Sequence, residues 1–347
     1  MLTEHVEAKW IACFVHTFSL CRIAAGDAVA ILSETQSREI NVRLAELALL
    51  QLGARVFHVR MPSPKLETHI PVRSTGSSNA IGGLEPVVNA LASVHTVVDC
   101  TVEGLLHAKE LPRILAGGAR LMMISNEHPE VLERLRPDPE LHPVVERAKQ
   151  RLASASQMVV TSSAGTDLRV DVRGAPVRGA AGYVSEPGKV AYWPGGLCLC
   201  FPKPGSVAGT VVLAPGDVNL TFKRYVESAV ELRIEDDHVL EIRGQGLDAD
   251  LMRSYYAAWG DRSAYGVSHV GWGLNPLARW EALAMYDKAQ INGTELRAFA
   301  GNFLFSTGAN EHAGRFTLGH FDLPMRNCSV ALDGQLVVDA GKLCASE

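Results

Sequence analysis

Residue types that bind metals are concentrated near the C-terminus of this sequence. His320 and Asp322 are separated by one residue, Phe321. Successive side chains of a β-strand point to opposite faces, so a strand here would place the imidazole and the carboxylate on one side. With His269, they form the set of two histidines and one carboxylate that holds non-haem Fe(II), and the same residue types also bind Zn²⁺. From spacing alone this signal is weak, and the alternative is an ordinary polar strand face.

The charge of such a site indicates what it would bind. Two neutral imidazoles and one carboxylate would leave a site with Fe(II) at net charge +1, which suits an anionic, chelating substrate. A packed strand histidine that donates to one backbone carbonyl is the alternative for His269, and solvent exposure is the alternative for His312. The segment 301–314 predicts a glycine-flanked polar loop that carries Ser306, Thr307, Asn310, Glu311 and His312.

Composition narrows the class of protein. The chain has 347 residues, 47% hydrophobic and 20% charged, with a net charge of −5. This profile is typical of a globular protein of two or three domains and gives no reason to expect a nucleic acid or membrane partner. No secretory signal is recognisable, and the seven cysteines include no CxxC pair. We therefore expect free thiols in a cytoplasmic protein.

The first part of the chain predicts an α/β domain. An amphipathic helix over residues 1–20 precedes apolar strand patterns that alternate with helical ones, and this order is typical of a parallel sheet covered on both faces. The expected strands are 26–32, 54–61, 95–100 and 119–125, and the expected helices are 35–53, 84–94 and 103–118. No glycine-rich phosphate-binding motif follows the first strand, so we do not expect dinucleotide binding.

The second part predicts an α+β domain with largely antiparallel sheet. Strand and hairpin patterns dominate it, including a tight turn at Asp333-Gly334, and helices are expected over 248–260 and 275–287. We expect Pro324 to end the regular pairing of its strand. The predicted domains are 1–152, which contributes to a cleft, and 153–347, which binds the metal and carries the catalytic site.

Several motifs in order resemble the 2,5-dihydroxypyridine 5,6-dioxygenase family, whose members open a pyridine ring in bacterial nicotinate degradation. The resemblance spans nearly the whole chain, and the fold it implies is similar to that of aminopeptidase T-like metallopeptidases. The motifs are TVEGLLHAKELPRIL (101–115), YVSEPGKVAYWPGG (183–196), GVSHVGWGLNP (266–276), NFLFSTG (302–308) and HFDLPMRNCSVALDG (320–334).

The resemblance implies roles for individual residues. His269, His320 and Asp322 match the iron ligands. His107 matches a histidine that acts as acid and base toward the substrate, and Leu106 lies beside it near the pocket entrance. Ser306 matches a residue that contacts the substrate. Because His107 comes from the first domain, the active site would lie between the domains.

The sequence departs from the family pattern at Tyr192, where a histidine is expected before Trp193. A tyrosine donates a hydrogen bond, but a pKa near ~10 makes it a poor proton shuttle at neutral pH. Tyr192 is thus either a catalytic residue in place of that histidine or a core aromatic. Glu186 is either a substrate contact or a turn residue before Pro187.

The resemblance implies an Fe(II)-dependent, extradiol-type dioxygenase. It would act with O₂ on 2,5-dihydroxypyridine or a close N-heterocyclic diol, give N-formylmaleamate, and form a homo-oligomer. One alternative is an aminopeptidase T-like metallopeptidase or amidohydrolase. Its two metals would need further carboxylates, and besides Asp322 the candidates are Glu186 and Glu311. The other alternative is a non-catalytic small-molecule binding protein.

Overall fold

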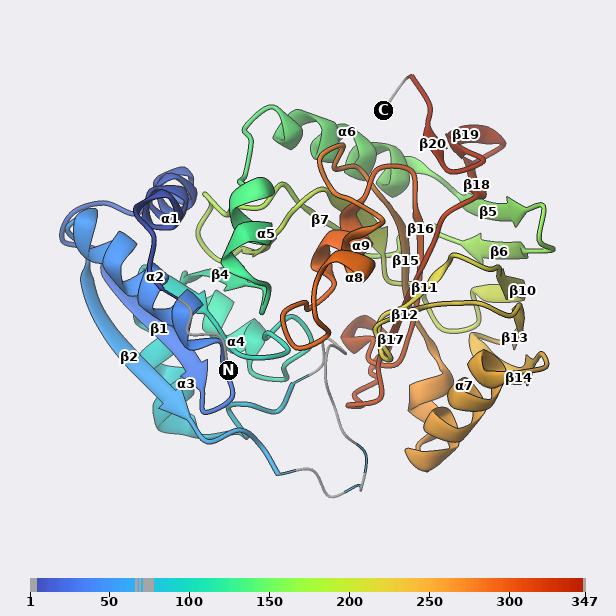
Figure 1. Ribbon diagram of the computed structural model, residues 1–347, viewed down its shortest axis with the longest axis horizontal. Coiled ribbons are helices and arrows are strands. Elements are labelled where there is room, and N and C mark those ends of the chain that lie inside the picture. The colour runs from blue at the N-terminus through green and yellow to red at the C-terminus, as the bar shows by residue number, and fades with distance from the viewer. Residues whose placement is uncertain (1–4, 66–67, 69, 71–77, 346–347) are drawn as a thin grey trace.

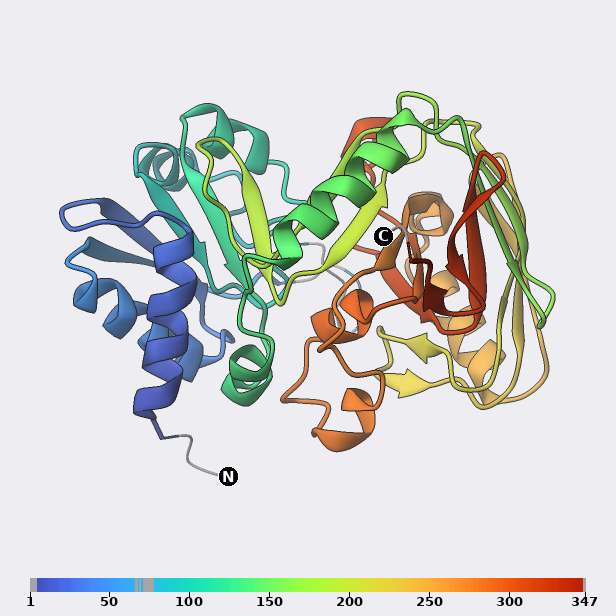
Figure 2. The ribbon, with the colours of Figure 1, turned by 90° about the horizontal axis from the view of Figure 1, so that it is seen from above.

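The computed structural model describes residues 5–65, 68, 70 and 78–345. Two sheet-containing halves lie side by side, with the N-terminal elements in blue and teal and the C-terminal elements in yellow to red (Figures 1 and 2). No helix in the described ranges is both long and apolar enough to cross a membrane. All seven cysteines are free, as predicted, and six of them are buried.

The first half contains the predicted parallel sheet. Its five strands have the order β2-β1-β3-β4-β8, and every neighbouring pair is parallel. Apolar side chains of α1 and α2 pack on one face, and those of α3 and α4 pack on the other. The elements are α1 (Ala8–Leu20), β1 (Ala28–Glu34), α2 (Glu39–Gln51), β2 (Arg55–Met61), α3 (Glu85–Ala92), β3 (Thr96–Asp99), α4 (Leu111–Ala116), β4 (Arg120–Ile124) and β8 (Val190–Trp193).

One predicted helix of this half is much shorter than expected. The helix expected over 103–118 forms only as α4, and residues 101–110 are a loop. Asp99 accepts hydrogen bonds from the backbone N–H groups of Thr101 and Leu105, at 3.0 and 2.7 Å, which bends the chain out of a helical path. Gly104 has φ +73°, and a Cβ there would lie 2.3 Å from the sulfur of Met123.

The second half is built on antiparallel sheets, as predicted. An eight-stranded sheet has the order β14-β13-β10-β6-β5-β18-β19-β20, and the hairpin at Asp333-Gly334 joins β18 to β19. Its strands are β5 (Gln157–Ser162), β6 (Asp167–Asp171), β10 (Val207–Leu213), β13 (Val230–Glu235), β14 (His238–Arg243), β18 (Cys328–Leu332), β19 (Gln335–Asp339) and β20 (Lys342–Leu343).

A second, five-stranded antiparallel sheet carries most of the candidate site residues. Its order is β17-β16-β15-β9-β7. The strands are β7 (Val177–Ala180), β9 (Leu197–Cys200), β15 (Val267–Gly273), β16 (Phe303–Thr307) and β17 (Phe321–Met325). The other elements are α5 (Pro129–Arg134), α6 (Leu141–Ser154), the pair β11 (Val218–Asn219) and β12 (Arg224–Tyr225), α7 (Leu247–Ala258), α8 (Ala282–Met285), α9 (Thr294–Ala298), and 3₁₀ turns at Arg262–Tyr265 and Glu311–Ala313.

Three local expectations for this half were wrong. Ser306 and Thr307 lie in strand β16 rather than in a loop. The helix expected over 275–287 is reduced to α8, because the side chain of Asn275 accepts from the backbone N–H of Leu277 and forms a turn instead. Pro324 does not end strand pairing: it lies within β17, which can contain it because β17 is the edge strand of its sheet.

The predicted domain division near residue 153 falls at the end of α6, and it stays a prediction. The chain crosses between the halves more than once. β8 follows the first strands of the second half in sequence, yet it pairs with β4 at the edge of the parallel sheet. The sheet of the first half is therefore completed by a segment that lies well beyond residue 152.

Candidate active site

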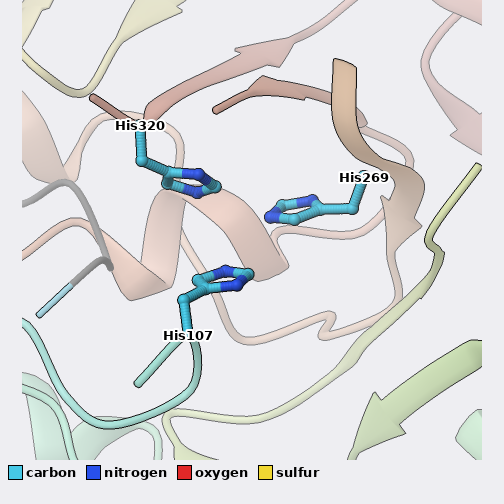
Figure 3. Close-up of side chains that lie close together, drawn as sticks. All are labelled: His107, His269 and His320. Atoms are coloured by element: carbon cyan, nitrogen blue, oxygen red, sulfur yellow. The ribbon is translucent and has the colours of Figure 1, made fainter. Parts of the chain in front are cut away.

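Three histidines from distant parts of the chain meet between the two halves. His107 lies in the loop after β3, at the carboxyl edge of the parallel sheet, where open α/β sheets commonly bind ligands. His269 lies in β15, and His320 directly precedes β17. Each imidazole offers a nitrogen, and these three nitrogens lie within 4.8 Å of one another (Figure 3). The structure thus brings His107 to the two histidines predicted as metal ligands.

Asp322 lies beside the same histidines. Its Oδ1 is 3.4 Å from Nε2 of His320 and 3.7 Å from Nε2 of His269. Phe321 points the other way, and its ring stacks on that of Tyr256 with centroids 3.7 Å apart. The alternation predicted for this segment is therefore confirmed.

An irregularity in β15 directs His269 toward this cluster. The register between β15 and β16 shifts between Val267 and Val270, so that β15 contains one residue more than its partner. Such a bulge re-aims a side chain and commonly occurs next to active sites. Ser268, in the bulge, donates its hydroxyl to the backbone carbonyl of Ala309 and anchors the distorted segment.

Burial keeps His269 and His320 neutral. Desolvation lowers the pKa of His269 to about 3 and also lowers the pKa of His320. Burial by itself would raise the pKa of Asp322, but the charge of Arg297 and then the imidazoles outweigh it and hold that pKa well below its usual value. Neutral imidazoles beside an ionised carboxylate are in the protonation state that binds a divalent metal.

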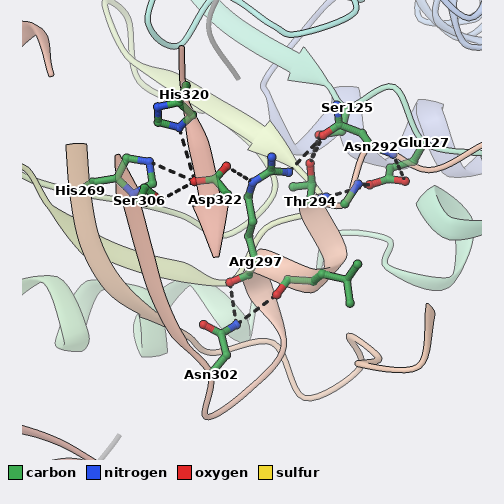
Figure 4. A network of polar contacts seen from close by, with 12 residues as sticks. Ser125, Glu127, His269, Asn292, Thr294, Arg297, Asn302, Ser306, His320 and Asp322 are labelled. Atoms are coloured by element: carbon green, nitrogen blue, oxygen red, sulfur yellow. Dashed lines mark hydrogen bonds and ion pairs between the residues drawn. The ribbon is translucent and has the colours of Figure 1, made fainter. Parts of the chain in front are cut away.

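Both oxygens of Asp322 have partners in the protein. Oδ2 accepts a hydrogen bond from Nε of Arg297 at 2.5 Å, and Oδ1 accepts one from the hydroxyl of Ser306 (Figure 4). Ser306, which the resemblance implies as a substrate contact, therefore donates to the carboxylate in this structure. Oδ1 is the oxygen that lies toward the histidines and is therefore placed to share a further ligand with them.

His107 is oriented by a carboxylate of the other half. Its Nδ1 lies 3.2 Å from Oε2 of Glu311. Burial would raise the pKa of Glu311, but the hydrogen bond and charge of His107 outweigh it and bring that pKa down to about 2. An ionised carboxylate only accepts, so Nδ1 of His107 carries the proton and Nε2 is the nitrogen left free. Sequence reasoning placed Glu311 in a polar loop near histidines but assigned it no such role.

Two buried carboxylates shape the loop that presents His107. Asp99 ends β3 and accepts from the backbone of Leu105, and Glu34 ends β1 and accepts from the backbone N–H of Val102 at 2.7 Å. Both strands are parallel neighbours, so their carboxyl ends lie together. These hydrogen bonds therefore fix the loop that carries His107 at the carboxyl edge of the sheet.

Comparison with known proteins shows the family of this chain. A sequence model of the 2,5-dihydroxypyridine 5,6-dioxygenase family matches residues 9–345. The 2,5-dihydroxypyridine 5,6-dioxygenase of Pseudomonas putida KT2440 is 36% identical over 338 residues, which are 96% of this chain and 95% of that protein. The chain belongs to this dioxygenase family. It is therefore placed among ring-cleaving oxidoreductases, and the resemblance seen in the sequence motifs is confirmed.

Solved structures support the same assignment. The structure of 2,5-dihydroxypyridine dioxygenase from P. putida KT2440 superposes with a TM-score of 0.92 at 35% identity and covers 99% of both chains. Wild-type AmpT from Thermus thermophilus superposes with a TM-score of 0.61 over 97% of this chain and 99% of that one, at 13% identity. The second match shows the fold alone. It confirms the prediction that this chain has an aminopeptidase T-like architecture.

Membership in a dioxygenase family implies a metal cofactor, and the donor set fits one. Nitrogen and carboxylate oxygen donors suit a divalent transition metal, and here they are buried and point toward one another. The Nδ1 atoms of His269 and His320 are buried and have no hydrogen-bond partner among the described residues. Each imidazole therefore keeps hydrogen-bonding or metal-binding capacity that protein contacts do not satisfy. Two donor sets are possible: the three histidines, or His269 and His320 with Asp322.

The other residues predicted to act at the site are Tyr192, Leu106 and Glu186, and they differ in burial. Tyr192 is in β8, and its buried hydroxyl has no hydrogen-bond partner in the described part of the chain. Burial raises its pKa, and the charges of Arg297 and Asp322 also act on it. Leu106 is half-buried and packs on the core of the first half. Glu186 is exposed in the turn before β8 and, within the described ranges, makes no hydrogen bond or ion pair with the histidines.

Proposed function

We propose that this protein is an Fe(II)-dependent dioxygenase that opens the ring of 2,5-dihydroxypyridine, or of a close N-heterocyclic diol, with O₂. The product would be N-formylmaleamate, in the degradation of nicotinate. The observation that carries the proposal is the position of Asp322 Oδ1 beside two buried, neutral histidines, in a chain that matches the dioxygenase family from end to end.

His269, His320 and Asp322 are the residues that would hold the iron. These two imidazoles and one carboxylate are a donor set that would hold Fe(II), and the bound iron would supply the redox chemistry that lets a chelating diol react with O₂. His107, from the first half, lies next to these residues, with its ring parallel to that of His269 at a centroid distance of 6.0 Å.

His107 is the proposed acid and base. Glu311 holds its Nδ1–H, so the free Nε2 is available to take a proton from a ring hydroxyl. The negative charge of Glu311 then stabilises the imidazolium that forms, and the proton can be returned to the opening ring. This division of roles is the same as that between the histidine and the orienting carboxylate of other general-base pairs.

The other predicted residues would position the ring. The unpaired hydroxyl of Tyr192 is suited to donate a hydrogen bond to the substrate, whereas its raised pKa makes it a poor proton carrier. Leu106, next to His107, would form an apolar wall at the entrance. Ser306 would orient the ring through the carboxylate it already touches, and Glu186 would contact the substrate only at its outer edge.

The geometry favours one metal over the two that a peptidase of similar fold would need. Among the described residues, metal-binding side chains come together in one place, where His107, His269 and His320 meet and Asp322 adjoins the last two. Glu311, the carboxylate that could extend it, is paired with His107. A second cluster of carboxylates for a bridging pair of ions is therefore missing from the described part of the site.

The decisive experiment is anaerobic reconstitution with Fe(II), followed by 2,5-dihydroxypyridine and O₂ in an oxygen electrode. We expect one iron per chain, one O₂ consumed per substrate, and N-formylmaleamate as the product in mass spectrometry. His320→Ala should abolish uptake, while His58→Gln, at an exposed histidine of β2, should not. Absence of uptake by the wild type, undiminished uptake by His320→Ala, or two metals per chain would contradict the proposal. Tight binding of the diol without O₂ uptake would indicate the non-catalytic alternative.

Oligomeric state and location stay predictions. The family resemblance implies a homo-oligomer, and we propose a cytoplasmic enzyme. Light scattering of the purified protein measures the first, and fractionation of cells that express the chain measures the second.

A further inference from the structure

Arg297 contacts Asp322 on the oxygen that the histidines do not approach. Its Nε donates to Oδ2 at 2.5 Å, while its Nη1 donates to Oδ1 of Asn292 at 3.2 Å. The guanidinium is mostly buried, with 12% of the side chain exposed, and Asp322 is exposed by 3%. A buried, charge-assisted hydrogen bond of this kind is strong and directional, so it holds the carboxylate in one orientation.

The short helix α9, which carries Arg297, is fixed by the first half of the protein. Glu127 is fully buried and accepts hydrogen bonds from three successive backbone N–H groups at residues 292–294, at 2.8 to 2.9 Å. Arg134 of α5 donates two hydrogen bonds to Glu295 of α9, at 2.6 and 2.8 Å. Figure 4 shows Glu127 with Asn292 and Thr294, and Arg297 with Asp322. Contacts with the first half thus fix α9, and the hydrogen bond to Asp322 fixes the guanidinium that α9 carries.

We propose that Arg297 is a positioning residue that leaves Asp322 a single oxygen for the metal. The inference rests on the proposed function, because it takes Asp322 as a metal ligand. A carboxylate can bind a metal through one oxygen or through both. With Oδ2 held by Arg297, it is Oδ1 that faces His269 and His320, so the carboxylate would bind the metal through that one oxygen.

A merely structural ion pair would behave differently. If Arg297 only neutralised a buried carboxylate, its loss would lower stability without changing how the metal is coordinated. If it restricts Asp322, its loss frees Oδ2 to turn toward the metal, and the coordination geometry changes. The readout that separates these roles is the coordination of the bound metal, measured independently of turnover.

The test uses Co(II) as a spectroscopic probe bound to the full-length protein. We compare the wild type with Arg297→Met, which removes both donors, and with Arg297→Lys, which keeps the charge but cannot donate from a planar fork. The measurements are visible absorption of bound Co(II), its Kd by calorimetry, and the melting temperature of the metal-free protein. The matched control is Arg134→Met, which also removes a partly buried ion pair with α9 but leaves Asp322 untouched.

We expect one Co(II) per chain in the wild type. Arg297→Met should change the intensity and position of the Co(II) bands and shift Kd by about tenfold or more. Arg134→Met should lower the melting temperature yet keep the wild-type spectrum. If Arg297→Met does not fold, Arg297→Lys should show a smaller change in the same direction.

Other results would overturn the proposal. A wild-type spectrum and Kd in the folded Arg297 variants would leave Arg297 with a structural role only. The same spectral change in Arg134→Met would assign the effect to the loosening of α9. A wild type that binds neither Co(II) nor Fe(II) would instead overturn the proposed function, so the two failures are distinguishable.

Discussion

Glu311 accepts a hydrogen bond from Nδ1 of His107, which lies 204 residues earlier in the chain. One half of the protein thus supplies the proposed base, and the other half supplies the carboxylate that selects its tautomer. Only 6% of the His107 side chain is exposed. Water therefore competes little for this hydrogen bond, and the orientation of the imidazole depends on the two halves being correctly placed.

Replacement of Glu311 by Gln should lower kcat by about 10²-fold, which is at the lower end of the contribution of general acid–base catalysis. The amide has no charge to stabilise a protonated His107, and it can present either a donor or an acceptor to Nδ1. Metal content should remain that of the wild type. Steady-state kinetics and metal analysis measure these effects, and an unchanged kcat would exclude the role.

Replacement of His107 by Gln should separate the two possible donor sets. If His269, His320 and Asp322 hold the metal, the variant keeps one iron per chain and loses turnover by about 10²-fold or more. If His107 is a ligand of a three-histidine site, the iron is lost as well. Metal analysis after desalting decides between these outcomes, with His269→Gln as the variant that loses iron in either case.

Replacement of Asp322 by Asn should weaken metal binding by at least about tenfold. The amide lacks the negative charge that the metal requires and leaves the buried Arg297 without a counter-charge. For this reason, we also expect the free energy of unfolding of the metal-free protein to fall by about 3 kcal/mol. Calorimetric metal titration and urea denaturation measure the two effects. Metal affinity equal to that of the wild type would contradict the assignment of Asp322 as a ligand.

The stability of the metal-free protein should depend on pH through His269. Its pKa is lowered from 6.5 to about 3 in the folded state, so between these values the unfolded chain binds a proton that the folded chain does not. His269 therefore does not reduce the free energy of unfolding above pH 6.5. As the pH decreases below 6.5, that free energy falls by up to about 1.4 kcal/mol per pH unit.

His269→Gln removes this dependence and supplies the test. Urea denaturation of the metal-free wild type and variant at pH 7, 6 and 5 should show a steeper loss of stability with decreasing pH in the wild type. Because every other titrating group is common to both proteins, the difference between the two curves isolates His269. Parallel curves would show that its pKa is not lowered by folding.

Replacement of Tyr192 by Phe should affect stability and substrate binding in opposite directions. A buried hydroxyl without a partner costs about 1–3 kcal/mol, so its removal should raise the free energy of unfolding of the substrate-free protein by about 1 kcal/mol. If the hydroxyl donates to the substrate, KM should rise while the metal content stays constant. Denaturation and steady-state kinetics give the two values, and an unchanged KM would leave Tyr192 as a packing residue.

Local sequence patterns predicted the framework of this protein well. Apolar strands that alternate with helices were sufficient for the parallel sheet, because its buried strands need side chains that are apolar on both faces. The spacing of His320 and Asp322 was sufficient to place both on one side of the chain, since alternation is a property of a single strand. The motifs in their order were sufficient for the family.

The centre of the site depends on contacts between residues far apart in the chain. Residues 101–110 have a helical pattern, but hydrogen bonds to Asp99 and Glu34 bend them into the loop that presents His107. The pairing of His107 with Glu311 joins the two halves, and that of Arg297 with Asp322 joins α9 to β17 within the second half. Spacing along the chain predicts which side chains share a face of one element, whereas the packing of separate elements decides which of those faces meet.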